Sequence, residues 1–474
     1  MITSGLTGSE AEDISPPLFS ATKIGYHLYI GHKLIFQEET HMKRLISKKT
    51  LAAYLTAAML LTGCANSSPA VQTEPVKNDP LVKTEIKLEE VADKKYDEDK
   101  LNAEYGRYSF ELMREIAANA SKKGNVMISP ASIMMALDMV EAGARGETLK
   151  QLADFFAKDT DPLEQQAFAA EMMQRINASK KIEFVCANAI WSDSEVLGDK
   201  INTDYRDYIR KTFDAEFNNV KFNKETHNIV NKWVDEKTNH MIPTLFDQPF
   251  DPNTVMVLVN AIKFEAKWKT GYTDDQIVKR EFRGADGNIN TDMLSSKEKG
   301  YFETDKATGF IKYYEGEEYA FVAILPKDEN ANANEFINSF TYEDYKKFVD
   351  SRSSTDVRAI MPEFKSDYSV GLNDILKNLG VTDLFNDGKA DLKGIANPVQ
   401  GNLYVTHVVH KTHIEVDRKG TKAAAATGIS IGVKSAKPME DEIKLVICDR
   451  PYVYAIVDTL TMNPVFIGTV NSVK

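Results

Sequence analysis

Hydrophobic residues recur with two different periods in the part of the chain that follows about residue 100. In its first half they return every three or four positions, as on one face of an α-helix. The helices predicted from this spacing cover residues 102–120, 147–157, 163–178, 201–213 and 226–239. Another is predicted to follow Ser129-Pro130, because serine is a favoured N-cap and proline suits the first helical position.

Strand-like runs dominate the second half. They are rich in β-branched and aromatic residues and cover 182–191, 255–264, 319–326, 404–416, 443–449, 452–457 and 464–470. Few strands alternate cleanly with helices, so a parallel βαβ fold is not indicated. The pattern predicts an α+β fold around a largely antiparallel sheet, in a single domain.

The segment from Arg418 to Pro438 does not fit either pattern well. Four consecutive alanines favour a helix, yet glycines stand on both sides of them. Alternate residues from Thr421 to Val433 are β-branched or small, and those between them are polar, charged or tiny. Period two is typical of a half-buried strand. Because the segment starts after Gly420 and runs into a Lys- and Pro-bearing loop, we interpret it as able to be either loop or strand.

Composition limits the classes of function. The chain has 474 residues, of which 43% are hydrophobic and 27% charged, with a net charge of -12. These values are typical of a globular protein, and the acidic balance argues against a nucleic-acid partner. Three widely spaced cysteines, Cys64, Cys186 and Cys448, suit neither a disulfide framework nor a zinc knuckle. Cys186 and Cys448 stand in apolar runs and are predicted to be buried free thiols.

A secretion signal precedes the globular part. A basic stretch begins at Met42 and is followed by an uncharged, mostly apolar run, 51–63, which is too short to span a membrane. The residues Leu61-Thr62-Gly63-Cys64 resemble the bacterial lipoprotein cleavage box. This resemblance implies cleavage before Cys64 and a lipid on its sulfur; the alternative is a plain signal peptide that contains a cysteine.

The expected organisation of the chain follows from this signal. Residues 1–41 lie upstream of it and are interpreted as an over-extended reading frame. The signal peptide covers 42–63, and 64–95, rich in Pro, Ser, Glu, Asp and Lys, is predicted to be a disordered tether. The folded domain is expected over 96–474. A lipid-anchored protein of this design would lie at the cell envelope, outside the cytoplasm, in an extracellular or periplasmic location.

From residue 100 onward the sequence resembles a serpin. The most specific motif is the hinge GTKAAAAT, Gly420 to Thr427. The supporting motifs are NVMISPASIMMALDMVEAGARGETLKQL (125–152), ANAIW (187–191), NKWVDEKTNHMI (231–242), LVNAIKFEAKWK (258–269), MPEFKSDYSVGLNDILKNLGVTDLF (361–385), VVHKTHIEVDRKGTKAAAATG (408–428) and DRPYVYAIVDTLTMNPVFIGTV (449–470).

The resemblance implies a serpin fold of about nine helices and three mostly antiparallel sheets, with an exposed reactive loop from Gly420 to about Lys437. It also implies a monomer without cofactor or enzymatic activity, whose partner is a target protease. The protease attacks one bond of the loop and becomes acylated. The freed hinge then inserts into the central sheet as a strand and traps the protease.

Individual positions are carried over from the family in the same way. The hinge needs small, uncharged residues on its inward face, and the chain offers Gly420, Thr421, Ala423, Ala424, Ala425, Ala426 and Thr427. Ser129, Ser132, Asn260 and His410 match a polar gating cluster beneath the opening sheet, and Trp191 matches a tryptophan near the top of the opening strands. The reactive bond is expected at Lys434–Ser435, which favours a trypsin-like target. Cleavage after Val433 would suit an elastase-like enzyme, and papain-like cysteine proteases also form acyl-enzymes.

One departure concerns the base of the hinge. Relatives usually carry acidic residues there, whereas this chain has Arg418, Lys419 and Lys422. The resemblance therefore predicts that the family's hinge latch is absent or has its charges exchanged.

The sequence also bears on three alternative functions. The motif GISIG would make Ser430 a nucleophile, but it lacks the preceding apolar strand and following helix that such an elbow needs. His407, His410 and His413 could be metal ligands, yet on a strand 407 and 413 lie about 20 Å apart and 410 points to the other face. A non-inhibitory serpin, acting as a surface binding or substrate-like protein, is the remaining alternative.

Overall fold

The computed structural model describes residues 85–398, 401–421 and 443–474, without the side chains of 185 and 186. All of these residues belong to one compact unit. No helix among these residues is both long enough and apolar enough to cross a membrane.

Most of the helices come from the first half of the described chain. The bounds predicted from periodicity agree with α4, α5, α7 and α8 to within two residues. Ser129 is the N-cap of α3, as expected: its side chain accepts a hydrogen bond from the Ser132 amide, and Pro130 occupies the first helical position. The helices are η1 (Leu88–Asp93), α2 (Glu98–Asn119), α3 (Pro130–Gly143), α4 (Gly146–Ala157), α5 (Pro162–Ala178), α6 (Ser194–Leu197), α7 (Thr203–Phe213), α8 (Thr226–Lys237), η2 (Asp274–Gln276), α9 (Ala333–Ser339), α10 (Tyr342–Asp350), α11 (Asn373–Asn378) and η3 (Asp383–Phe385).

A six-stranded sheet forms the centre of the helical part. Its strands, in spatial order, are β3 (Glu216–Val220), β2 (Ile182–Asp193), β4 (Met256–Lys267), β12 (Gly420–Thr421), β11 (His407–Val416) and β10 (Phe364–Gly371). For most of their length β4 and β11 pair directly with each other, in parallel. The short β12 lies between them only at one end, where it pairs antiparallel to both.

The remaining strands form one nine-stranded sheet. We expected three sheets in all, but the described strands form only two. The long β6 pairs with β5, β9 and β7 in turn and so joins them into one sheet. Most pairs are antiparallel, as predicted. The strands are β1 (Met127–Ile128), β15 (Pro464–Val470), β14 (Tyr452–Asp458), β8 (Tyr319–Pro326), β7 (Ala307–Tyr313), β6 (Gly287–Glu303), β9 (Ser353–Pro362) and β13 (Lys444–Ile447), with β5 (Ile277–Gly284) beside β6.

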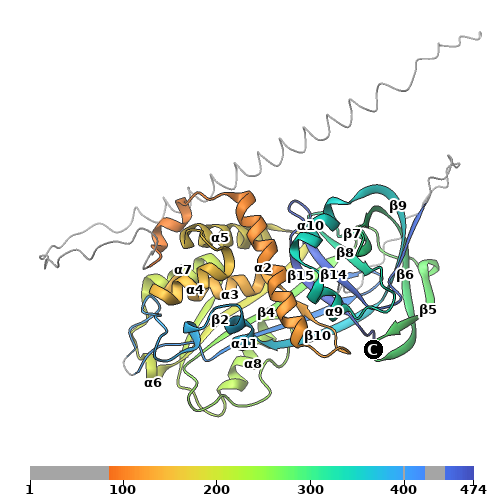
Figure 1. The fold of residues 1–474 in the computed structure, drawn as a ribbon. Helices are drawn as coiled ribbons and strands as arrows, with labels where there is room; N and C mark the ends of the chain where they lie inside the picture. The colour runs from red at the N-terminus through yellow and green to blue at the C-terminus, as the bar shows by residue number, and fades with distance from the viewer. Residues whose placement is uncertain (1–84, 399–400, 422–442) are drawn as a thin grey trace, which may run out of the picture. The chain divides into compact units, whose positions relative to one another are not determined.

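Helices cover both faces of the six-stranded sheet. Figure 1 shows α2, α3, α4 and α5 on one side of β2 and β4, and α8 on the other. Alternation along the strands explains this arrangement, because successive side chains point to opposite faces. On β4, Leu258 packs into the core that contains α3, whereas Val257 and Val259 pack with Val230 and Val234 of α8.

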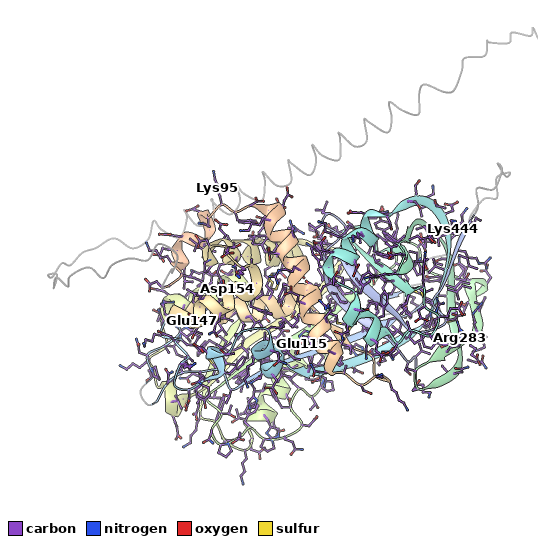
Figure 2. The ribbon with its side chains drawn as sticks, in the orientation of Figure 1. Lys95, Glu115, Glu147, Asp154, Arg283 and Lys444 are labelled. Carbon is purple, nitrogen blue, oxygen red and sulfur yellow. The ribbon has the colours of Figure 1, made fainter. Side chains whose placement is uncertain are left out.

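The folded body begins earlier than we expected. Residues 85–95 were predicted to belong to the tether, but Ile86 and Val91 are buried, and η1 packs against α5. The Lys94 ammonium lies 2.7 Å from the Asp161 carboxylate at the start of α5. Polar neighbours of these two apolar residues stay outside; Figure 2 shows Lys95, for example, on the outer surface. Lys94 also lies 3.5 Å from Glu164, and Glu85 lies 3.2 Å from Arg145, so buried apolar side chains and ion pairs both join this stretch to the helices.

Candidate functional site

The predicted gating cluster forms where α3 meets the middle of the six-stranded sheet. His410 of β11 stands directly opposite Asn260 of β4, and its Nδ1 lies 2.6 Å from Asn260 Oδ1. The Asn260 amide nitrogen donates to the Ser132 backbone oxygen at 2.9 Å. The Ser129 amide donates to His410 Nε2 at 3.1 Å, and the Ser129 hydroxyl donates to the Val465 carbonyl. The structure thus brings Ser129, Ser132, Asn260 and His410 together.

These contacts fix the state of the imidazole. Nε2 accepts from a backbone N–H, so it carries no proton, and Nδ1 must be the atom that donates to Asn260 Oδ1. The ring is fully buried, and this burial lowers the pKa of His410 to about 3. The histidine is therefore neutral at physiological pH, and it links β4 to β11 through a side-chain hydrogen bond.

The same hydrogen bond crosses the line along which the sheet could open. We call the parallel pairing between Val257–Lys263 of β4 and His407–His413 of β11 the seam. Separating these strands would break both the backbone ladder and the His410–Asn260 bond. The cluster is thus placed to resist opening, since an unpaired buried polar group costs about 1–3 kcal/mol.

The seam is split at one end by the first residues of the hinge. Gly420 pairs with Lys267, and Thr421 pairs with Ala266 on one side and Val416 on the other. Thr421 is fully buried, and its hydroxyl lies 2.7 Å from the Tyr314 hydroxyl. A Cβ at position 420 would stand 2.1 Å from the Ala266 backbone oxygen, so only glycine fits there. Two hinge residues therefore already occupy strand positions in the sheet.

The tryptophan beside the hinge is Trp268, whereas Trp191, which we expected near the top of the opening strands, lies toward the other end of β4. Trp191 pairs with Val257, nine positions along β4 from the residue that faces Thr421, which corresponds to about 30 Å. Trp268 donates from Nε1 to the Asp417 carbonyl and from its amide to the Lys419 carbonyl. It also stacks on Tyr314, with ring centroids 4.6 Å apart. The motif that contains Trp268 could be identified in the sequence, but the sequence did not show which end of β4 lies beside the hinge.

A charge-exchanged latch is present at the base of the hinge. The Arg418 guanidinium lies 3.3 Å from the Glu363 carboxylate and 3.2 Å from that of Asp274. The Arg418 backbone amide also donates to Glu363, at 3.1 Å. Of the two arrangements predicted for this basic hinge, the structure has the exchanged one. These contacts connect Glu363, which lies between β9 and β10, to the turn that leads into β12.

The other predicted residues fall into two groups. Cys448 is a buried free cysteine, as expected, and His413 Nδ1 lies 2.7 Å from Asp367. His407 is half-buried, and burial lowers its pKa. The remaining positions lie outside the described residues or, for Cys186, have no described side chain: Cys64, Cys186, Lys422, Ala423, Ala424, Ala425, Ala426, Thr427, Ser430, Val433, Lys434 and Ser435.

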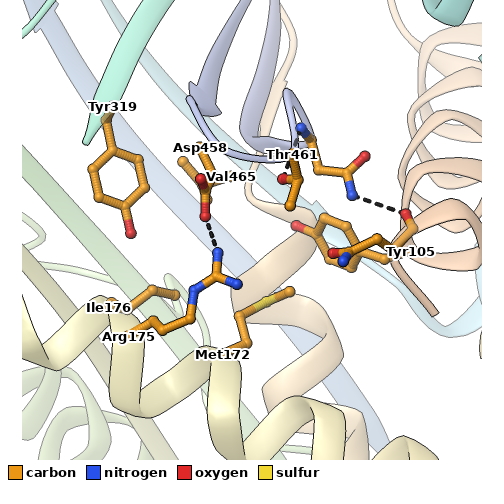
Figure 3. A pocket seen from close by; sticks show the side chains of 10 residues that line it. Tyr105, Met172, Arg175, Ile176, Tyr319, Asp458, Thr461 and Val465 are labelled. Carbon is orange, nitrogen blue, oxygen red and sulfur yellow. Dashed lines mark hydrogen bonds and ion pairs between the residues drawn. The ribbon is translucent and has the colours of Figure 1, made fainter. Parts of the chain in front are cut away.

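Two small hollows, each of about 20 Å³, lie among the described residues. The hollow in Figure 3 lies between α2, α5 and the turn after β14, and has a volume of about 20 Å³. An ion pair between Arg175 and Asp458 borders it, with Tyr319 and Met172 nearby. A volume of this size holds about one water molecule.

Comparison with known proteins agrees with this geometry. A family model described as Serpin (serine protease inhibitor) matches residues 103–473. Iripin-5 from Ixodes ricinus is 31% identical over 79% of this chain and 95% of its own length. Serpin B11 from Homo sapiens is 31% identical over 77% of this chain and 97% of its own length.

Solved structures give the same result. The thermophilic serpin tengpin in its native state matches with a TM-score of 0.73 and 35% identity, covering 80% of this chain and 95% of tengpin. Its latent state matches with a TM-score of 0.68, at the same identity and over 80% of this chain and all of tengpin. By sequence, family model and fold, the chain belongs to the serpin family, whose members are typically protease inhibitors, although some are non-inhibitory.

Proposed function

We propose that this serpin is a suicide inhibitor of secreted serine endopeptidases, and that papain-like cysteine proteases are further targets. The observation that carries the proposal is the position of β12, whose two residues already enter the sheet between β4 and β11. A strand that continued from Thr421 would part the seam one pair at a time. The function requires the rest of the hinge to follow that path.

The register of β12 supports this path. Continued antiparallel to both neighbours, it carries the alternate hinge residues Ala423, Ala425 and Thr427 onto the face that packs against α3. Their cross-strand neighbours would be Phe264 and Ile414 for Ala423, Ile262 and Thr412 for Ala425, and Asn260 and His410 for Thr427. Small side chains are needed beside such bulky ones. The Thr427 hydroxyl would arrive where the Asn260–His410 hydrogen bond must break, and can replace it.

The covalent step is that of an ordinary acyl transfer. The protease serine oxygen attacks the carbonyl carbon of Lys434, and the amine of Ser435 leaves with the proton from the serine. The protease is then held as an ester. Insertion of about 12 residues at about 1 kcal/mol per backbone hydrogen bond contributes roughly 10 kcal/mol. The uncleaved form is accordingly held by kinetics, and insertion distorts the protease before water reaches the ester.

The reactive bond and the location complete the proposal. Lysine at 434 suits the acidic specificity pocket of a trypsin-like protease, whereas cleavage after Val433 would direct the loop to an elastase-like enzyme. The signal peptide at 42–63 and a lipid on Cys64 would place the inhibitor at the cell envelope, outside the cytoplasm, as a monomer on a tether.

A gel experiment on the wild type and two hinge variants tests the proposal. The chain from Ala65 would be mixed with trypsin, an elastase and papain, and examined under denaturing conditions. A band at the summed mass is expected, and the preferred protease identifies the bond. Thr421→Arg should leave cleavage intact and raise the fraction of cleaved, untrapped chain roughly tenfold or more, because it forces a charge into a buried strand position. Thr421→Ser, which keeps the hydroxyl, is the control.

Two results would contradict the proposal. Unchanged trapping by Thr421→Arg would exclude insertion through β12. Cleavage of the wild-type loop by every protease, with no covalent band and full protease activity, would favour a non-inhibitory serpin whose loop is only a substrate.

A further inference from the structure

Two glutamates stand at the point where the seam divides. The parallel ladder between β4 and β11 ends at the pair Lys263–His413. Two residues further on, the same register would place Glu265 opposite Glu415, and both are half-buried. Like charges directly opposite each other destabilise a sheet. The ladder thus ends before the position at which its continuation would pair two carboxylates, and β12 lies between the strands beyond that point.

The hinge is aligned so that its next residue enters between these carboxylates. Thr421 pairs with Ala266 and with Val416, so the antiparallel register places the following residue opposite Glu265 and Glu415 at once. That residue is Lys422. Lys422 itself lies outside the described residues, and the two described pairs of Thr421 determine the place that it would take on insertion.

The glutamates are not fully neutralised by their described neighbours. Glu265 lies 2.5 Å from the Lys263 ammonium, but Lys263 is shared with Glu183, at 2.8 Å. Among the residues that the structure describes, none forms an ion pair with Glu415. A site with two carboxylates and one shared lysine favours a further cation between the strands.

We propose that Glu265 and Glu415 are positioning residues that select a basic side chain at 422 when the hinge inserts. The inference rests on the proposed inhibitory function, since it concerns the speed of the same insertion. The arrangement of charges is the same as in the latch four residues earlier, where the basic Arg418 contacts the acidic Glu363. Basic residues of the hinge thus pair with acidic residues at two stages. Arg418 pairs with Glu363 in the native state, and Lys422 would pair with Glu265 and Glu415 at the first step of insertion.

The expected effect is on the partition between trapping and release. An opposite-charge pair across two strands changes an equilibrium by a factor of up to about five, and a like-charge pair acts in the other direction. Slower insertion lets more of the acyl-enzyme hydrolyse. Lys422→Glu and Glu415→Lys should each raise the number of inhibitor molecules consumed per trypsin trapped by about two- to five-fold.

Rescue by the double variant separates charge from a general loss of fold. Lys422→Glu combined with Glu415→Lys restores an opposite-charge pair and should return the stoichiometry to within about twofold of wild type. Glu415→Gln should change it in the same direction as Glu415→Lys, by less. Glu281→Lys, an exposed change on β5 away from the seam, is the matched control and should leave it unchanged. Thermal unfolding of each uncleaved variant checks that the native fold is kept.

The outcomes distinguish this inference from the proposed function. If the wild type traps trypsin and the charge variants behave like Glu281→Lys, the selection of Lys422 is overturned while the inhibitory function stands. If the single variants are impaired and the double variant is no better than either, the pairing is likewise overturned. If the cleaved wild type neither traps a protease nor gains thermal stability, the inhibitory function fails, and the inference fails with it.

Discussion

Acidification should loosen the seam through His410, and the direction follows from the two states of the imidazole. In the closed sheet, burial lowers the pKa of His410 to about 3, whereas an exposed histidine has a value of 6.5. Between these two pH values only the opened sheet binds the proton. The free energy that holds the seam closed is therefore intact above pH 6.5 and is lost as the pH falls toward 3.

The size of the effect can be worked from these values. Each unit of pKa difference corresponds to about 1.4 kcal/mol. At a pH below both pKa values, the free energy that favours the closed sheet over the opened one is therefore lower by about 5 kcal/mol than at neutral pH. At pH 5 the opened histidine is almost fully protonated and the closed one is not, and the loss is about 2 kcal/mol. This exceeds a typical hydrogen bond and should be measurable.

Hydrogen–deuterium exchange of the β4 and β11 backbone amides is a suitable assay. After correction for intrinsic exchange rates, the opening free energy of the wild type should fall by about 2 kcal/mol between pH 7.5 and pH 5. His410→Gln is the control, because its amide can accept from Ser129 and donate to Asn260 without titrating. His407, whose pKa is also lowered by burial, is present in both proteins, so its contribution cancels.

Equal pH dependence in the wild type and His410→Gln would refute the reasoning. It would mean that the imidazole stays neutral, or stays buried, when the seam opens. A larger fall in the variant than in the wild type would contradict the sign of the linkage itself.

Three further predictions concern the hinge and its latch. Tyr314→Phe removes the hydroxyl partner of Thr421 and should speed amide exchange in β12 about fivefold, as expected for the loss of about 1 kcal/mol. Arg418→Glu places two carboxylates together at the latch and should lower the free energy of unfolding. The loss should be at most about 1 kcal/mol, because both side chains are partly exposed. Adding Glu363→Arg should restore the thermal midpoint, and no restoration would show that the pair does not interact. Gly420→Val should expel β12 from the sheet, because its Cβ would meet backbone at 2.1 Å; faster limited proteolysis near the hinge is the measurement, and an unchanged rate would contradict the described pairing.

Local features of this protein were predictable from the sequence. The cap at Ser129 and the bounds of α4 and α8 follow from spacing and end signals within a few residues, so no distant contact is needed to identify them. The alternation from Thr421 onward indicated a segment able to be either loop or strand; of that segment only Thr421 is described, and it lies in β12 (Gly420–Thr421). The motifs of the family also identified the four residues that meet at the seam.

Long-range register was decided only by the tertiary structure. Sequence patterns named both Trp191 and the motif that contains Trp268, but which end of β4 meets the hinge depends on strand pairing between segments about 150 positions apart. The same is true of the contact between Arg418 and Glu363, which are 55 residues apart. Periodicity assigns a side chain to a face of its strand. Only the alignment of neighbouring strands determines which side chains stand opposite each other, because a shift in register changes every cross-strand pair while leaving the pattern along each strand the same.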